Sequence, residues 1–306
     1  MGETRKMHYV PECYLQYFAH RRLRQHYVYA LPKAGGNLFE TNIGNICTER
    51  DLYTLPGEDQ EQRQILEKMY NDLYEVGYDN IYNILTNPEK EALTPEEHYK
   101  VVAFAVSLFF RNHAWHIFHN RVTDTIIEQA YNLTKDREKS SFFFEDQELS
   151  IAGKTLEELQ KMIREKSRPM IATQTALQIF QPIRLRIMND HVSVVTASVG
   201  FEFITSDNPV TFKPFNIKLR PVPMDPTNSL WVPIDSQHLL TLHPWADQLE
   251  GQTLGRMKDG PFPGIQSSMS NHFQWQQSDR FLLGTEAGLE KFQARPSGIF
   301  PPEKMG

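Results

Sequence analysis

Cysteine is scarce in this chain of 306 residues, in which only Cys13 and Cys47 occur. Two cysteines are too few for a disulfide-stabilised scaffold or a cysteine-rich zinc site, and they are compatible with a reducing compartment. Long apolar runs are also missing: none approaches the roughly 18 residues that a membrane helix requires, and the first residues lack the apolar segment of a signal peptide. We therefore expect a cytoplasmic protein without a membrane partner.

The chain has no basic excess either, because its formal net charge is -6. Proteins that bind duplex nucleic acid over a broad surface usually carry an excess of cations, so the charge leaves room only for a local basic patch. The sequence also lacks the glycine-rich loops that bind phosphate, the GxSxG elbow and the CxxC motif. Nucleotide-binding, serine-hydrolase and thioredoxin-like functions thereby lose their usual support.

What the chain does have is the composition of a globular protein, with 40% hydrophobic and 23% charged residues. The middle of the chain, about 58–188, repeats apolar residues at spacings of three and four, which predicts amphipathic helices. Residues 189–300 are rich in β-branched and aromatic residues, and residues 1–57 contain a predicted strand–turn–strand. We predict an α+β fold in which the helical middle packs on one mostly antiparallel sheet formed by N-terminal and C-terminal strands. Because both ends would share that sheet, residues 1–306 are predicted to form a single domain.

One helix in the middle is predicted to be unusually long. The segment from Thr94 to Glu97 supplies an N-cap, a proline at the first helical position and a carboxylate at the third, as in a capping box. From there the helical pattern continues without interruption to Leu133, and its apolar first half predicts the centre of the helical core. Residues 136–150 are expected to be a charged break before the next helix.

Three stretches of the sequence resemble a bacterial family. They are His8-Tyr9-Val10-Pro11 with Tyr14, Leu15 and Phe18; Thr205-Ser206-Asp207-Asn208-Pro209; and Val232-Pro233-Ile234 leading into Leu239-Leu240-Thr241-Leu242. Together they are similar, in order and over most of the chain, to the family named domain of unknown function forty-two thirty-eight. The resemblance implies which polar positions are typical of the family, but no reaction. Members tend to carry an arginine at Arg111 followed by Thr-Pro, where this chain has Asn112-His113.

The segment from Arg111 to His116 resembles the motif of the HEPN ribonucleases, in which an arginine and a histidine on one helix cleave RNA without metal. A guanidinium can bind phosphate through two hydrogen bonds, and an imidazole can transfer a proton near neutral pH. Residues five apart lie about 140° around a helix, so one site would combine two protomers and imply a homodimer. In the alternative interpretation, Arg111 pairs with an acid where the buried half ends, and the histidines lie on a solvated face.

Asp207 lies where the strand Phe201–Thr205 is predicted to end, a position from which a rigid strand often presents functional side chains. Its carboxylate could orient a histidine, bind a metal or accept a proton. Alternatively, Ser206, Asp207 and Asn208 cap a turn through local hydrogen bonds. His8 and Tyr9 form a polar pair on a segment that Pro11 holds extended, and their alternative is a histidine bonded to backbone beside a core tyrosine.

The histidines of the long predicted helix suggest a metal site as a separate alternative. His113, His116 and His119 recur at intervals of three, so neighbouring pairs could share a metal ion on one helix face. A third ligand is not evident from the sequence. We therefore expect no cofactor, with a divalent metal as the open alternative.

These observations predict an intracellular phosphodiester-cleaving enzyme, a metal-independent ribonuclease of toxin or phage-defence type. The predicted catalytic residues are Arg111, His116, His8 and Asp207, and the predicted substrate-binding residues are Tyr9, Asn112, His113 and Asn208. One alternative is a non-enzymatic module that binds a ligand or a partner protein. Another is a metal-dependent hydrolase that uses His8, Asp207 and a helix histidine.

Overall fold

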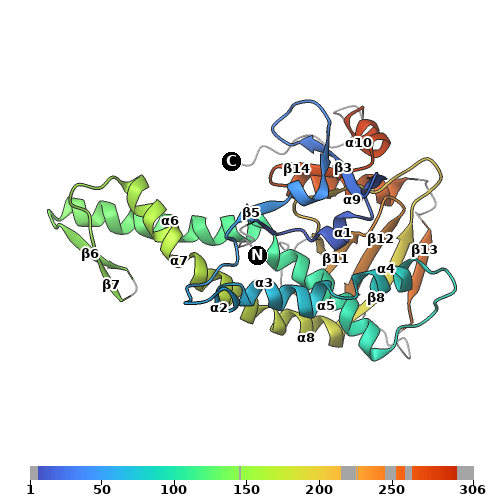
Figure 1. The fold of residues 1–306 in the computed structure, drawn as a ribbon, viewed down its shortest axis with the longest axis horizontal. Coiled ribbons are helices and arrows are strands. Elements are labelled where there is room, and N and C mark those ends of the chain that lie inside the picture. Colours follow the sequence, from blue (N-terminus) through green and yellow to red (C-terminus); the bar gives the residue numbers. More distant parts are fainter. Residues whose placement is uncertain are drawn as a thin grey trace.

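The first sheet of the molecule joins strands from the two ends of the chain (Figure 1). The computed structural model describes residues 6–144, 146–214, 225, 227–244, 253–258 and 264–294. The strands of this sheet are ordered β2 (His20–Arg22), β3 (Gln25–Pro32), β14 (Phe281–Gly284) and β9 (Thr205–Ser206), and β4 (Phe39–Asn42) also pairs with β3. All of these pairs are antiparallel. The predicted pairing of N-terminal with C-terminal strands is therefore confirmed.

A second five-stranded sheet adds to the single sheet that the sequence predicted. Its order is β10 (Thr211–Pro214), β11 (Asn228–Pro233), β12 (His238–Pro244), β8 (Asp190–Thr196) and β13 (Gly255–Lys258). Only the β13–β8 pair is parallel among its described strands. Every residue of β11 is buried, which is typical of a strand covered on both faces. Two further pairs complete the strands: β1 (Lys6–His8) with β5 (Thr48–Arg50), and β6 (Ser141–Phe144) with β7 (Gln147–Ser150).

Helices dominate the middle of the chain, so the α+β class is confirmed. The middle helices are α2 (Gln60–Arg63), α3 (Ile65–Tyr70), the π-helical turn η2 (Asn71–Glu75), α4 (Tyr78–Thr86), α5 (Pro95–Arg111), α6 (His113–Asp136), α7 (Leu156–Gln178) and α8 (Phe180–Asn189). Outside the middle lie α1 (Glu12–Leu15), the 3-10 turn η1 (Ile43–Asn45), α9 (Ile265–Gln277) and α10 (Glu286–Gln293). The single domain over residues 1–306 stays a prediction, because part of that range is outside the described residues.

The long helix predicted from Thr94 is in fact two helices. Its start is as predicted: the Thr94 hydroxyl accepts from the Glu97 backbone N–H, and the Glu97 carboxylate accepts from the Thr94 N–H. Helix α5 then ends at Arg111, because Asn112 adopts an extended conformation with ψ of 155°. Its side-chain oxygen accepts from the Trp115 N–H at 2.7 Å and so caps a new helix, α6. The prediction of one continuous helix was wrong at this residue.

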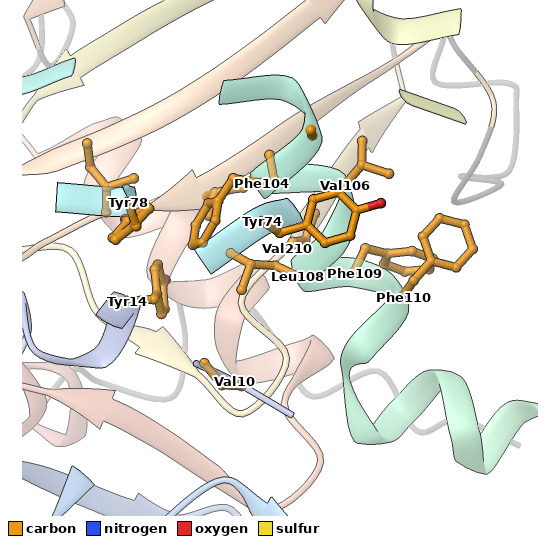
Figure 2. Packing of buried hydrophobic residues seen from close by; sticks show 14 of the residues in the cluster. Val10, Tyr14, Tyr74, Tyr78, Phe104, Val106, Leu108, Phe109, Phe110 and Val210 are labelled. Atoms are coloured by element: carbon orange, nitrogen blue, oxygen red, sulfur yellow. The ribbon is translucent and has the colours of Figure 1, made fainter. Parts of the chain in front are cut away.

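The family-like stretches meet in the core, at the hydroxyl of Tyr14, which Figure 2 shows among its apolar neighbours. Tyr14 is buried, donates to the Pro233 carbonyl at 2.6 Å, and lies 2.7 Å from the Thr205 hydroxyl. It belongs to the largest cluster of buried apolar side chains, in which Phe104 of α5 stacks on Tyr78 at 4.0 Å between ring centres. This hydroxyl therefore links the N-terminal segment to both sheets.

Helices α6 and α7 extend from the body as an arm, with the β6–β7 hairpin at its far end (Figure 1). The arm has its own apolar cluster, built on Ile127, Leu159 and Ile163, with Phe142 and Phe144 of the hairpin packed against it. The break expected at 136–150 does separate two helices, but it contains a hairpin that the sequence did not predict, in which Phe142 and Phe144 are covered by this cluster. No helix in the described part of the chain combines the length and apolar character needed to cross a lipid bilayer.

Candidate active site

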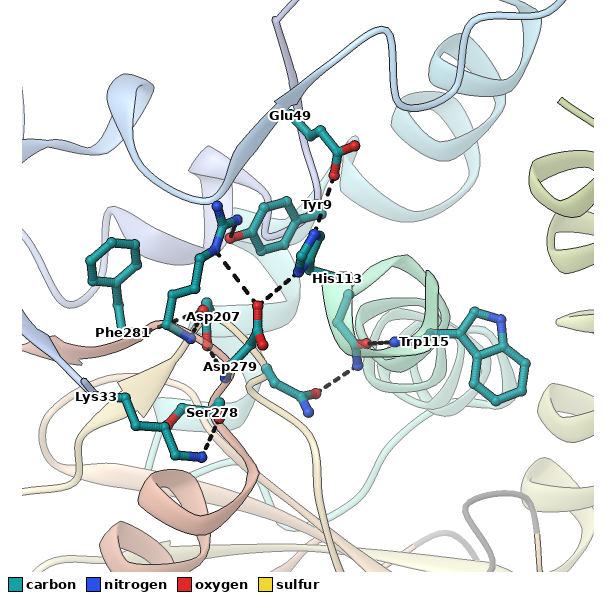
Figure 3. A network of polar contacts seen from close by, with 12 residues as sticks. Tyr9, Lys33, Glu49, His113, Trp115, Asp207, Ser278, Asp279 and Phe281 are labelled. Carbon is teal, nitrogen blue, oxygen red and sulfur yellow. Dashed lines mark hydrogen bonds and ion pairs between the residues drawn. The ribbon is translucent and has the colours of Figure 1, made fainter. Parts of the chain in front are cut away.

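A polar network surrounds His113, the first residue of α6 (Figure 3). Its Nδ1 lies 2.8 Å from Oδ2 of Asp279, and its Nε2 lies 3.5 Å from Oε2 of Glu49. The ring packs against Tyr9, with 5.7 Å between ring centres. Segments that are far apart in sequence therefore meet at one imidazole, at the point where the arm leaves the body.

The partners of His113 fix its proton arrangement. An ionised carboxylate only accepts hydrogen bonds, so Nδ1 carries the proton that it donates to Asp279. In the neutral ring Nε2 then has a free lone pair, and Glu49 at 3.5 Å is beyond a strong hydrogen bond. His113 therefore has the arrangement of a general base.

Asp207 holds the segment that carries Asp279. Its Oδ1 accepts from the Asp279 backbone N–H at 2.9 Å, and its Oδ2 accepts from the N–H groups of Arg280 at 2.7 Å and Phe281 at 3.2 Å. Burial raises the pKa of Asp207, although these three donors act in the opposite direction. The structure thus places Asp207 behind the site, where it positions Asp279 through the backbone rather than contacting a histidine.

Two buried asparagines join the start of α6 to the body. The side-chain amide of Asn112 donates to the side-chain oxygen of Asn208 at 2.6 Å, and the amide of Asn208 donates to the Gln277 carbonyl at 3.0 Å. Both residues were predicted to bind substrate. In the structure their amide groups bond to other parts of the protein, and they fix where His113 begins its helix.

Tyr9, another predicted substrate contact, is also buried. Its hydroxyl accepts from the Arg280 guanidinium at 2.5 Å, and burial raises its pKa far above the ordinary value. The same guanidinium lies 3.7 Å from Asp279. Neither Asp279 nor Arg280 was predicted from the sequence. The signal was available, because an acid and a cation directly precede the strand that begins at Phe281.

Arg111 lies away from this network and is 1% exposed. One terminal nitrogen of its guanidinium pairs with Glu75, and the other donates to the His8 carbonyl at 2.9 Å. The aromatic rings of Tyr53 and Tyr70 also lie against it. Burial acts to lower the pKa of Arg111, but its anionic and phenolic neighbours outweigh that effect and raise it. Arg111 therefore has an acid partner, as the alternative interpretation expected.

His8 is the second N-terminal residue that was predicted to be catalytic. Its Nε2 lies 3.3 Å from the Ile43 carbonyl and 3.5 Å from Glu12, and burial lowers its pKa. The structure joins His8 to Arg111 through the His8 carbonyl, whereas Asp207 lies with Asp279. The four residues predicted to be catalytic therefore occupy more than one place.

His116, unlike Arg111 and His8, lies in the same pocket as His113. Both line a pocket of about 220 Å³ between α6 and α7. The pocket also contains three cations and two carboxylates, contributed by Lys161, Arg164, Arg168, Glu49 and Glu165. Arg168 donates to Glu49 at 2.8 Å, and Arg164 donates to Asp124 at 2.6 Å. Nε2 of His116 is enclosed and has no hydrogen-bond partner among the described residues.

The environment of His116 predicts a pH dependence of stability. Burial, together with His113, His119 and Arg168, lowers its pKa to about 4. Unfolded, it takes up a proton near pH 6.5, so the folded state loses stability as the pH falls from about 6.5 to 4, by roughly 2–3 kcal/mol. Urea unfolding of wild type and His116→Gln at pH 7 and pH 4.5 measures this. The variant should lose less stability on acidification, and an equal loss in both proteins would contradict the assignment.

The histidines of α6 do not form a metal centre with neighbouring acids. Within the part of the chain that the structure describes, no group of three or more histidine, cysteine, aspartate or glutamate side chains is arranged to hold a metal ion. His119 packs edge-on against Trp115 at 4.8 Å between ring centres, and burial lowers its pKa. The third helix histidine therefore belongs to a local aromatic contact.

Comparison with known proteins finds one family. No curated protein and no solved structure matches the chain. A model of the family described as a protein of unknown function (DUF4238) matches residues 6–282, which include the N-terminal motif, the arm and nearly all of both sheets. The match covers most of the sequence, and the chain therefore belongs to the DUF4238 family.

Proposed function

We propose that this protein is a metal-independent phosphodiester-cleaving enzyme that acts on RNA at the pocket between α6 and α7. The observation that carries the proposal is that His113, bonded to Asp279, lines one pocket with Lys161, Arg164 and Arg168. An oriented imidazole beside clustered cations is suited to moving a proton next to a phosphate. RNA supplies both the phosphate and a neighbouring hydroxyl that can attack it.

In this reaction Nε2 of His113 removes the proton of a ribose 2′-hydroxyl. The 2′ oxygen then forms a bond to phosphorus while the bond to the 5′ oxygen of the next nucleotide breaks. That leaving oxygen takes a proton from water, and the resulting hydroxide takes up the proton that His113 accepted, which restores the neutral imidazole. The products are a 2′,3′-cyclic phosphate and a free 5′-hydroxyl. Asp279 stabilises the protonated imidazole, and Asp207 keeps Asp279 in place.

The cations of the pocket provide the phosphate contact that was first assigned to Arg111. Arg168 is half-exposed and donates to Glu49, so its guanidinium can turn to an incoming phosphate at little cost. Arg111 is enclosed and occupied on both terminal nitrogens. His116 is neutral at pH 7, given its lowered pKa, so it adds no charge beside the phosphate.

The experiment is an incubation of purified protein with total RNA, with and without EDTA, beside His113→Ala. A matched control is His119→Ala, a histidine on the same helix outside the pocket. We expect wild type and the control to cleave RNA in EDTA and to leave cyclic phosphate ends. Loss of the base should reduce the rate roughly 10²–10⁴-fold. Uncontrolled cleavage of this kind would slow the growth of cells that express the wild type, as for a toxin or phage-defence protein.

Other outcomes of the same assay separate the alternatives. Cleavage that stops in EDTA would favour a metal-dependent hydrolase and contradict the base assigned to His113. Intact RNA in all reactions would remove the enzyme proposal. In that case, binding of phosphate or a nucleotide, measured by calorimetry and weakened in Arg168→Ala, would identify the pocket as a ligand-binding module.

A further inference from the structure

Helix α6 carries an apolar stripe on the solvent side of the arm. Its members are Phe118, Val122, Ile126 and Leu133, which are 56%, 46%, 46% and 56% exposed. At 100° per residue they lie within about 80° of one another around the helix, and they extend over about 22 Å of its length. The opposite side of α6, with Ile127 and Thr134, is buried and faces the rest of the arm. A stripe of this size, left in water, marks an interaction surface.

The charges beside the stripe have a pattern of their own. Arg121 and Glu128 are exposed and lie seven residues apart, so both project along the same edge of the stripe. Neither takes part in an ion pair with another described residue. In contrast, Asp124 is already bound to Arg164 of α7. The edge therefore presents one cation and one anion, each available to a partner.

The positions of Arg121 and Glu128 indicate which kind of partner fits this surface. In an antiparallel two-fold pair, the same edge of each helix faces the other in reversed order, so Arg121 can lie opposite Glu128. In a parallel two-fold pair, each residue lies level with its own copy, so Arg121 would not lie opposite Glu128. In an antiparallel pair centred between residues 124 and 125, Arg121 of each helix stands opposite Glu128 of the other. In this register Val122 of each helix lies within about one residue of the height of Ile126 of the other, so the two stripes meet at the centre of the contact. The surface is complementary to itself, which is the requirement for a two-fold interface.

We propose that two copies of this chain pair through the stripe of α6, antiparallel and around a two-fold axis near residues 124 and 125. The inference does not rest on the proposed function. His113, His116 and Asn120, which line the pocket, project from a side of α6 about 145° away from the centre of the stripe. Pairing therefore leaves the pocket open. A dimer was also predicted from the Arg111–His116 spacing, but that reason is lost because the two residues lie on different helices.

The test is the molar mass in solution, measured by sedimentation equilibrium over a range of concentrations. Wild type should be a dimer. Val122→Glu with Ile126→Glu should be a monomer, because it places carboxylates within the apolar contact. Val199→Glu, at a fully exposed apolar residue outside the arm, is the matched control and should remain a dimer. Melting curves followed by circular dichroism would show that these surface variants fold.

Charge reversal tests the register. Arg121→Glu alone and Glu128→Arg alone each place like charges opposite each other twice, so each should weaken dimerisation roughly tenfold or more. A mixture of the two variants should form heterodimers, because each repulsive pair becomes an attractive one. The double variant should dimerise like wild type. A monomeric wild type, dimers that tolerate both single reversals, or a mixture that does not associate would overturn the proposal.

Discussion

Replacement of Arg111 by alanine is expected to destabilise the fold by about 3–5 kcal/mol, because it leaves the carboxylate of Glu75 without its buried partner. The His8 carbonyl loses its donor, and the space between Tyr53 and Tyr70 is left empty. The free energy of unfolding in urea measures the effect. Loss of RNA cleavage in this variant would then report unfolding, not a missing phosphate contact.

Arg164→Ala is the matched control for that measurement. Arg164 also pairs with an aspartate, but it is half-exposed on the arm, where an ion pair contributes about 0–1 kcal/mol. It should therefore be nearly as stable as wild type. If Arg111→Ala proved as stable as Arg164→Ala and still lacked activity, Arg111 would return to the catalytic role that the sequence predicted.

Local signals in the sequence were sufficient for much of the fold. The capping box at Thr94 depends on residues within one turn, and it forms as predicted. The break at Asn112 was missed because an asparagine inside an apolar pattern is ambiguous without its tertiary partner. That partner is Asn208, which is 96 positions away in the chain. Capping that depends on residues within one turn was therefore predicted from the sequence, whereas hydrogen bonds between residues far apart in the sequence were not.

The candidate site was predicted in part for the same reason. His113 was named as a substrate contact, but its role depends on Asp279, which lies 166 positions away. Asp207 was named because it ends a strand, and its three backbone partners explain why a carboxylate stands there. An asparagine has one accepting oxygen and could not serve all three donors. Asp207 thus fixes the backbone segment that carries Asp279, whose carboxylate is bonded to His113.

The family-like motifs themselves mark a structural junction more than a reaction centre. Tyr14 follows the His-Tyr-Val-Pro motif, Thr205 begins the Thr-Ser-Asp-Asn-Pro motif, and Pro233 lies in the Val-Pro-Ile motif. The Tyr14 hydroxyl touches the other two in a fully buried position. Positions typical of the family can therefore record packing, as Tyr14, Thr205 and Pro233 do here.

The most direct consequence of the proposed chemistry concerns Asp279. Asp279→Asn should lower the rate of RNA cleavage roughly 10²–10⁴-fold, because an amide N–H₂ facing Nδ1 favours the tautomer whose Nε2 carries a proton and cannot accept another. The side chain of Asp279 is 28% exposed, so folding should be retained. The effect should fall on kcat, since the pocket cations that bind phosphate are unchanged.

Glu49→Gln provides the matched comparison, because Glu49 is the other carboxylate beside His113 but stands 3.5 Å from its ring. At that distance it does not set the tautomer, so kcat should fall less than about tenfold. Because Glu49 also holds Arg168, the main change should be in KM. Equal losses of kcat in the two variants would point to charge alone, and wild-type activity in Asp279→Asn would remove His113 from the role of base. A large loss confined to Asp279→Asn would instead locate the base at the imidazole where the arm meets the body.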